Sequence, residues 1–320
     1  MKRRLAAAAG SVNYPLRCEL DAYRKLRRCL SLRPAISNRV SVLKILRGWL
    51  VVLVLSTALA HAVDVDEFAR HRTPAPNVVP YRSIQTPGRL DNERLPLIVF
   101  LHGSGQNGDN NEDQIDGNAN GALELVDTAI QASLPLMFVA PQIDDDYWSP
   151  RAVAAVVADA MRRYPIDPHR ILLTGVSDGG TGVWDTLKAF PTCFAAGVPM
   201  SGMTELAGLA SIRDVPQWIF HGEKDNDTNV ETGYGGAMIG SRPVVRALRA
   251  MGGQPRYTEY ANKKHVIWPQ AFGEEALLPW LMSQRLHGCA CDFSAVANDR
   301  VDHDTSLASN LRSRAGHCVR

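Results

Sequence analysis

The stretch Ile171-Leu-Leu-Thr-Gly-Val-Ser-Asp-Gly-Gly180 contains the pattern G-x-S-x-G at Gly175, Ser177 and Gly179. An apolar run precedes the serine and a helical pattern follows it, which is the strand, turn and helix context of a nucleophile elbow. Such a turn strains the serine backbone, so the residues two positions to either side must be small. The two glycines meet this condition. Ser177 is therefore the predicted nucleophile, against the alternative of an incidental serine in a glycine-rich turn.

Short apolar runs alternate with amphipathic stretches on both sides of this motif. The runs predict strands at Leu95–Leu101, Leu136–Ala140, Ile171–Gly175, Ala195–Met200, Trp218–His221 and Arg256–Tyr260. The amphipathic stretches predict helices at Pro150–Tyr164, Gly179–Phe190, Arg242–Met251 and Glu274–Leu286. Strands without polar alternation are covered on both faces. The order therefore predicts an α/β fold, with a doubly wound, mostly parallel sheet flanked by helices in a single domain.

A serine hydroxyl becomes a good nucleophile only when a base removes its proton, and in this fold the chain order is serine, acid, histidine. Asp225 follows the strand Trp218–His221 in a loop, where it can hold the tautomer of a histidine. Asp227 and Glu223 are rival acids in the same loop. His265 lies after the last predicted strand and before the last predicted helix, so it is the predicted base.

Acyl transfer also needs donors for the developing oxyanion, and backbone amides are a common source. The loop Leu101-His-Gly-Ser-Gly-Gln-Asn-Gly108 follows a strong strand and offers the amide of Ser104. The amide of Asp178, the residue after the nucleophile, is the second expected donor. Trp148 and Trp268 are candidates for lining the substrate pocket, with packing as their alternative role.

The same loop also spells G-x-G-x-x-G at Gly103, Gly105 and Gly108, the pattern of dinucleotide-binding loops. Such a loop must open at once into a helix whose N-terminus meets the pyrophosphate. Three carboxylates in Asp109-Asn-Asn-Glu-Asp113 would repel that group. A cofactor-free hydrolase is therefore favoured over a dehydrogenase, and no metal is expected.

With these residues in place, the segment Leu95–Gln284 resembles the secreted esterase or "predicted peptidase" group of α/β-hydrolases, related to the phospholipase/carboxylesterase and polyhydroxybutyrate-depolymerase families. The resemblance rests on Phe100-Leu-His-Gly-Ser-Gly105, Val139-Ala-Pro-Gln142, Leu173-Thr-Gly-Val-Ser177, Phe220-His-Gly-Glu-Lys-Asp225, and Tyr257-Thr-Glu-Tyr260 through His265 to Trp268. It implies an α/β-hydrolase fold, a triad of Ser177, Asp225 and His265, and hydrolysis of carboxylic esters without a cofactor.

Two positions depart from the family pattern. Asp178 stands where the family usually has methionine, and Asn229 stands where the loop after the acid usually has proline. The Asp178 amide can still donate, but its carboxylate lies beside a site that must hold negative charge. We expect it to slow acylation or to make His265 harder to deprotonate. With asparagine in place of proline at position 229, the sequence does not determine how rigid this loop is.

The N-terminal segment has the order of an export signal. Lys44 and Arg47 precede the apolar run Trp49–Ala60, and small residues surround a predicted cleavage site after Ala62. The run is short for a membrane span, so export to the periplasm or outside is expected, without a stable span after cleavage, and a membrane-anchored form is the alternative. The arginine-rich residues 1–39 suggest a true translation start near Val40 or Val42.

These boundaries divide the chain into four parts. Residues 1–62 are the predicted N-terminal extension and signal peptide, 63–80 an irregular linker, 81–287 the catalytic domain, and 288–320 a disordered or loosely attached tail, or else a frameshifted end. In an oxidising compartment, a disulfide from Cys289 or Cys291 to Cys318 is expected.

Composition narrows the range of functions further. The net charge is +2, and beyond the first fifty residues no basic stripe interleaved with aromatics occurs, so nucleic acid is not an expected partner. The sequence predicts a serine hydrolase acting on small-molecule or polymeric esters. The alternatives are a serine peptidase or polyester depolymerase with the same triad, and a non-catalytic binding module on a hydrolase fold.

Overall fold

The computed structural model describes residues 62–88, 94–115, 121–294 and 318–319. The predicted extension and signal peptide lie outside the described residues, apart from Ala62. Among the described residues, no helix combines the length and apolarity needed to cross a bilayer.

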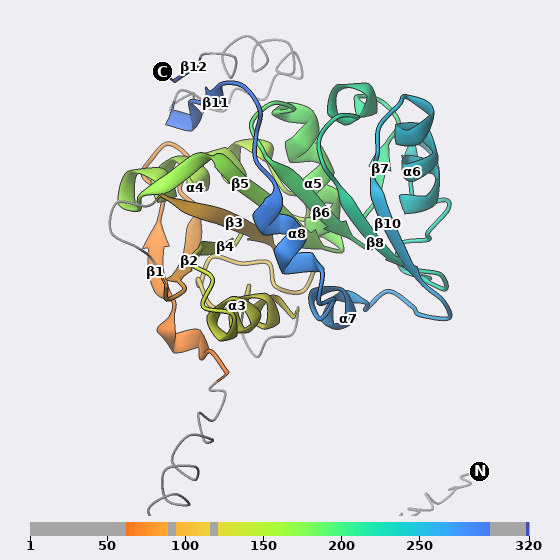
Figure 1. Cartoon of the computed structure of the whole chain (residues 1–320). Helices are drawn as coiled ribbons and strands as arrows, with labels where there is room; N and C mark the ends of the chain where they lie inside the picture. Colours follow the sequence, from red (N-terminus) through yellow and green to blue (C-terminus); the bar gives the residue numbers. More distant parts are fainter. Residues whose placement is uncertain (1–61, 89–93, 116–120, 295–317, 320) are drawn as a thin grey trace, which may run out of the picture. The chain divides into compact units, whose positions relative to one another are not determined.

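The centre of the fold is an eight-stranded sheet of order β1-β2-β4-β3-β5-β6-β8-β10 (Figure 1). The strands are β1 (Ala69–Arg72), β2 (Pro80–Gln85), β3 (Leu95–Leu101), β4 (Met137–Pro141), β5 (Ile166–Val176), β6 (Ala196–Met200), β8 (Trp218–Gly222) and β10 (Arg256–Tyr260). β2 pairs antiparallel with β1 and β4, and all the other neighbours are parallel. The carboxyl ends of the parallel strands therefore meet at one edge of the sheet.

Helices cover both faces of the sheet, as the continuous apolar strands require. They are α3 (Ala122–Gln131), α4 (Pro150–Arg163), α5 (Asp178–Ala189), α6 (Ser241–Ala250), α7 (Trp268–Phe272) and α8 (Leu277–Ser283). Alternate residues of β3 enter two separate cores: Leu97 and Val99 pack with buried residues of α4, α5 and α6, whereas Ile98 and Phe100 pack with those of α3, α7 and α8. Figure 1 shows α3, α7 and α8 on the same side of the sheet.

The predicted fold class is confirmed, and the six predicted strands and four predicted helices are present. The main differences in extent are that β5 begins five residues earlier than predicted, at Ile166, and α8 covers only Leu277–Ser283. Sequence reasoning missed α3, α7 and the antiparallel strands β1 and β2. The remaining small elements are the 3-10 helices Val65–Glu67 and Leu209–Ile212 and the short strands β7 (Thr204–Glu205), β9 (Met238–Ile239), β11 (Ala290–Cys291) and β12 (Cys318–Val319).

The prediction of an irregular linker at residues 63–80 is wrong for its central part. β1 lies within it and pairs with β2, from Ala69 opposite Ser83 to Arg72 opposite Pro80. The strand is short and carries charged, mostly exposed side chains, so it lacks the apolar signal of the inner strands. Its pairing partner, and not its own composition, makes it a strand.

The predicted loose tail begins too early. A disulfide joins Cys193 to Cys291, and Phe293 packs edge-on against Phe190 and Phe194. The chain up to residue 294 is thus attached to the core. The predicted pairing of Cys291 with Cys318 is wrong, because Cys291 is bonded to Cys193. Cys289 is also disulfide-bonded, and its pairing with Cys318 stays a prediction.

Candidate active site

Ser177 occupies a sharp turn between β5 and α5. Its backbone has φ of 55° and ψ of −118°, a left-handed conformation that is costly for a residue with a side chain. A Cβ added to Gly175 would lie 2.4 Å from the carbonyl oxygen of Gly179, and one added to Gly179 would lie 2.0 Å from that of Leu101. Only glycine allows these close approaches, which explains why G-x-S-x-G stands here.

Ser177, His265 and Asp225 follow three different strands and meet at the carboxyl edge of the sheet. The Oγ of Ser177 lies 2.7 Å from Nε2 of His265, and Nδ1 of His265 lies 2.7 Å from Oδ2 of Asp225. With a hydrogen on Nδ1, the imidazole donates to the carboxylate and its Nε2 accepts the serine hydroxyl hydrogen. The structure thus brings together the three residues predicted to act as nucleophile, base and acid.

The carboxylate of Asp225 is fully enclosed and well supplied with donors. Burial alone would raise its pKa, but hydrogen bonds from His221 and His265, the charge of His265 and the amide of Thr228 hold the pKa well below its usual range. The backbone amides of Asp227 and Thr228 donate to Oδ1 at 2.9 and 2.8 Å. Asp225 therefore stays ionised.

The rival acids have other positions. Glu223 accepts a hydrogen bond from the amide of Asn262. Asp227 lies near the triad. One possible ligand atom from each of Asp225, Asp227 and His265 lies within 4.8 Å of the other two, a spacing that could hold a metal ion. Asp225 and His265, however, already bond to each other, which favours a hydrogen-bonded triad.

Two further residues, Ser201 and Trp268, contact His265. Neither contact was predicted from the sequence. The buried hydroxyl of Ser201 donates to the carbonyl oxygen of His265 at 2.9 Å. Trp268, at the start of α7, places its ring edge-on to the imidazole with centroids 5.5 Å apart. Ser201 comes directly after β6, and its position at the carboxyl end of a parallel strand was the feature of the sequence that could have identified it as a residue near the site. The predicted pocket residue Trp268 thus lies beside the base.

The loop after β3 packs directly on the nucleophile. A Cβ added to Gly103 would lie 3.1 Å from the Cβ of Ser177. The loop is fixed by His102, whose Nδ1 lies 2.9 Å from the carbonyl oxygen of Gly103 and whose Nε2 accepts the amide of Ile143 at 3.2 Å. Of the two predicted oxyanion donors, Ser104 therefore lies in a loop packed on the nucleophile, and Asp178 follows Ser177 directly in the chain.

The side chain of Asp178 lies within this predicted oxyanion site. Burial raises the pKa of its carboxyl and the charge of Asp146 adds to the rise, while the charge of His265 and hydrogen bonds from the hydroxyl and backbone amide of Ser104 oppose it. The polar groups of Ser104, whose amide is predicted to bind the oxyanion, thus interact with this carboxylate. A substrate oxygen must compete with the carboxylate for that amide.

Replacing Asp178 with methionine is expected to raise kcat on a small neutral ester by about tenfold, which corresponds to about 1.4 kcal/mol of transition-state stabilisation. The variant removes the carboxylate that interacts with Ser104, and with it a negative charge beside the oxyanion. Asp178→Asn should give a smaller gain, because its amide oxygen can still accept from Ser104. Steady-state kinetics with p-nitrophenyl acetate measures both. Asp146→Asn is the control, since it removes a nearby charge and leaves the Asp178 carboxylate in place beside Ser104. Unchanged or reduced turnover in Asp178→Met would contradict the prediction.

His102 is a buried group that must stay neutral. It is 1% exposed. Burial lowers its pKa from 6.5 to about 4, although the bond to Gly103 opposes the shift. Because Nε2 accepts the Ile143 amide, protonation would break that bond and place a charge under the loop.

The folded state should therefore lose stability as the pH falls. Between the unfolded pKa of 6.5 and the folded value of about 4, the unfolded chain binds a proton that the folded protein does not. Across this window His102 should lower the free energy of unfolding by about 2 to 3 kcal/mol. Urea titrations at pH 7 and pH 4.5 measure this loss. The wild type and the exposed control His287→Gln should both lose the full amount, whereas His102→Gln should lose less. Equal losses in all three proteins would refute the prediction.

Trp148 has the packing contacts that were the alternative to its predicted place in the pocket wall. It is 5% exposed, and its Nε1 donates to the carbonyl oxygen of His102 at 3.0 Å. A Cβ added to Gly182 of α5 would meet its side chain at 2.6 Å. The ring is thus enclosed between the loop after β3 and α5, and its place in the substrate pocket stays a prediction.

The dinucleotide alternative also fails on local geometry. Residues 109–115 form bends and turns in place of the required helix. The amide of Gly108, which a phosphate would need, donates to the carbonyl oxygen of Ile143 at 2.8 Å. A Cβ at Gly108 would lie 3.1 Å from the side chain of Gln142. The loop is therefore packed for support and does not open toward a pyrophosphate.

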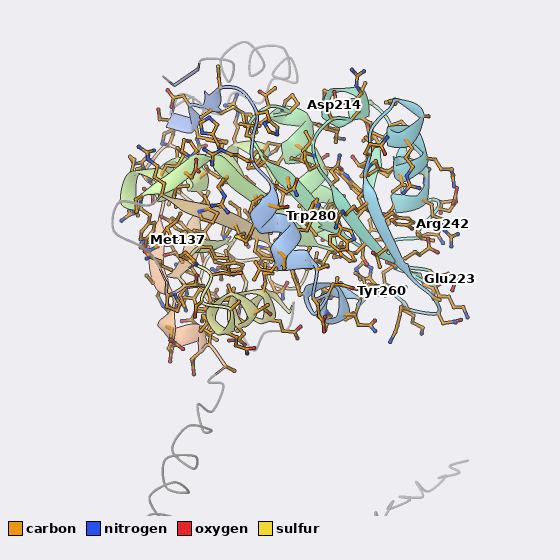
Figure 2. The ribbon with its side chains drawn as sticks, in the orientation of Figure 1. Met137, Asp214, Glu223, Arg242, Tyr260 and Trp280 are labelled. Carbon is orange, nitrogen blue, oxygen red and sulfur yellow. A yellow bond between two sulfur atoms is a disulfide. The ribbon has the colours of Figure 1, made fainter. Side chains whose placement is uncertain are left out.

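A cavity of about 320 Å³ lies elsewhere, at the amino ends of β8 and β10. Arg213, Asp214, Arg256 and Trp280 are among its lining residues. In Figure 2, Asp214 and Trp280 mark this region, while Glu223 and Tyr260 mark the opposite ends of the two strands, toward the triad. None of the residues lining this cavity belongs to the triad, and it is not the candidate active site.

Comparison with known proteins adds solved structures of the same fold. The chain matches no family model and no curated protein sequence. A thermostable esterase is 30% identical with a TM-score of 0.62 over 69% of this chain, and the chain spans 64% of that protein's length. The feruloyl esterase module from Clostridium thermocellum, in complex with sinapinate, is 15% identical with a TM-score of 0.53, covering 69% of this chain and 89% of that one.

The likeness to the feruloyl esterase module shows the fold alone. The thermostable esterase shares both the fold and 30% sequence identity with this chain. Three observations point to the same fold: the strand order, the serine turn after β5 and the identity to the thermostable esterase. The chain therefore has the α/β-hydrolase fold.

Proposed function

We propose that this protein is a serine hydrolase that cleaves carboxylic esters through an acyl-enzyme intermediate. The observation that carries the proposal is the unbroken hydrogen-bonded chain from Ser177 through His265 to the ionised Asp225, with both links 2.7 Å long. A strained serine turn and a buried, charged acid are arranged for nucleophilic attack. The esterase likeness at 30% identity supports the same activity.

The reaction follows from the roles of these groups. Ser177 attacks the ester carbonyl and its hydroxyl proton passes to Nε2 of His265, while Asp225 stabilises the resulting imidazolium. The amides of Ser104 and Asp178 donate to the oxyanion. The intermediate collapses, the C–O bond to the alcohol breaks, and His265 gives the proton to the leaving oxygen. Water, activated by the same imidazole, then hydrolyses the acyl-enzyme and releases the acid.

A fluorophosphonate probe tests the proposal, because it labels an activated serine covalently. We expect labelling of the full chain and loss of labelling in Ser177→Ala. Ser211→Ala is the matched control, since its hydroxyl is exposed and bonds only locally to Gly208. A folded wild-type protein that does not react would contradict the proposal and would favour the binding-module alternative.

The preferred substrate is the next question for this site. We propose small-molecule or polymeric esters. p-Nitrophenyl esters of increasing acyl length would define the acyl preference, and a peptide p-nitroanilide with the same acyl group would test the peptidase alternative. A higher kcat/KM for the anilide than for the matched ester would overturn the ester assignment.

We further propose that the protein works outside the cytoplasm, after cleavage near Ala62. The Cys193–Cys291 disulfide and the bonded Cys289 support an oxidising compartment. Cell fractionation tests this location. N-terminal sequencing of the mature protein should give Val63 as its first residue, and recovery of the uncleaved chain in the cytosol would contradict export.

A further inference from the structure

His221 lies behind the acid of the triad, at the end of β8, and is completely buried. Its Nε2 lies 2.8 Å from the carbonyl oxygen of Thr228 and 3.1 Å from Oδ2 of Asp225. Its Nδ1 lies 2.7 Å from the Oγ of Ser241, the first residue of α6. His221 thus lies against the same carboxylate oxygen that His265 contacts.

The neighbours of His221 determine which ring nitrogen carries the hydrogen. A carbonyl and a carboxylate face Nε2, and both can only accept, so Nε2 must donate. In the neutral ring Nδ1 is then an acceptor, and the Ser241 hydroxyl donates to it. Ser241 is itself buried. This fixed hydroxyl therefore selects the tautomer that directs N–H toward the loop carrying Asp225.

The contacts of His221 set the position of the acid as well as its charge. The loop from Asp225 to Thr228 folds back so that two amides bind Oδ1, and Nε2 of His221 holds the Thr228 carbonyl at the base of the same turn. Oδ2 is left facing both imidazoles. On the neighbouring strand Glu259 is opposite His221 in register, but it is paired with Arg242. The carboxylate of Asp225 is thus the acid that His221 orients.

We propose that His221 is a positioning residue for the triad: with its tautomer set by Ser241, it holds the Asp225 loop so that Oδ2 stays aligned with Nδ1 of His265. The inference rests on the proposed hydrolase function. The hydrogen-bonded chain then runs through five side chains, from Ser241 through His221, Asp225 and His265 to Ser177. Without His221, Asp225 remains present but turns away from the base, which lowers the fraction of enzyme in the productive geometry.

The test compares His221→Gln with His221→Asn. Nε2 of glutamine can occupy the place of the imidazole Nε2 and donate to Asp225 and Thr228, whereas the shorter asparagine places its amide near the position of Nδ1. Turnover of p-nitrophenyl acetate is expressed per fluorophosphonate-labelled site, so that unfolded protein does not count. We expect His221→Asn to lower kcat at least tenfold with KM within twofold, and His221→Gln to restore most of the rate.

The pH profile separates positioning from a purely structural role. In His221→Asn the midpoint of the acid limb of kcat/KM should move to lower pH, because a displaced carboxylate no longer favours protonation of the base. Ser241→Ala should shift it in the same direction by a smaller amount. His71→Asn, a partly buried histidine bonded to Ser83 and Tyr164 on the antiparallel side of the sheet, should leave the profile unchanged.

Two results would overturn the inference. One is a kcat per labelled site in His221→Asn within threefold of the wild type. The other is an equal loss in the glutamine and asparagine variants with an unshifted acid limb, which would indicate packing alone. Failure of the wild type itself to label would instead contradict the proposed hydrolase function.

Discussion

Ser177→Ala is expected to lower kcat for a p-nitrophenyl ester by a factor on the order of 10⁶, the size of loss seen when a triad nucleophile is removed. His265→Ala should cause a loss of similar size, because the hydroxyl of Ser177 is then left without the base that lies 2.7 Å away. KM should change little, since neither variant removes the substrate-binding surface.

The double variant makes this prediction more specific. Ser177 and His265 act as one unit, so removing both should cost little more than removing either, leaving only the catalysis supplied by the Ser104 and Asp178 amides. Ser211→Ala serves as the control for a lost hydroxyl. If the two losses in kcat multiplied in the double variant, the residues would be acting independently and the triad assignment would be wrong.

Removal of the Cys193–Cys291 disulfide should have the largest effect on stability. The bond closes a loop with a sequence separation of 98 residues. A loop of this length reduces the entropy of the unfolded chain enough to stabilise the fold by about 4.7 kcal/mol. The double variant Cys193→Ser with Cys291→Ser should lose this amount in urea unfolding, and should also loosen the packing of Phe293 on Phe190 and Phe194.

Activity distinguishes this effect from damage to the site. Cys193 lies at the amino end of β6 and Ser177 at the carboxyl end of β5, so the bond and the nucleophile occupy opposite edges of the sheet. The folded variant should keep wild-type kcat at 25 °C. With a thiol reductant present in both samples, the wild type and the variant should be equally unstable, because reduction also breaks the bond of Cys289 in each. A loss below 1 kcal/mol, or a difference that persists after reduction, would contradict the prediction.

The sequence alone determined the inner part of the fold and the identity of the candidate triad residues. The reason is that both depend on local signals. Strands buried on two faces must be continuously apolar, as Leu95–Leu101 is, and a strained serine turn must have glycines where Gly175 and Gly179 stand. Because parallel strands end at one edge, the order of Ser177, Asp225 and His265 along the chain was enough to predict that they meet.

Only the tertiary structure determined the partners that carry no local signal. β1 is a strand because β2 pairs with it, Cys291 bonds to Cys193 because folding brings the chain end back to the start of β6, and Trp148 is enclosed because α5 packs on it at Gly182. The same holds for the carboxylate of Asp178 beside Ser104 and for His221 behind Asp225. Each depends on a contact between residues distant in sequence, and the energy of such a contact is set by the packed structure and not by either segment alone.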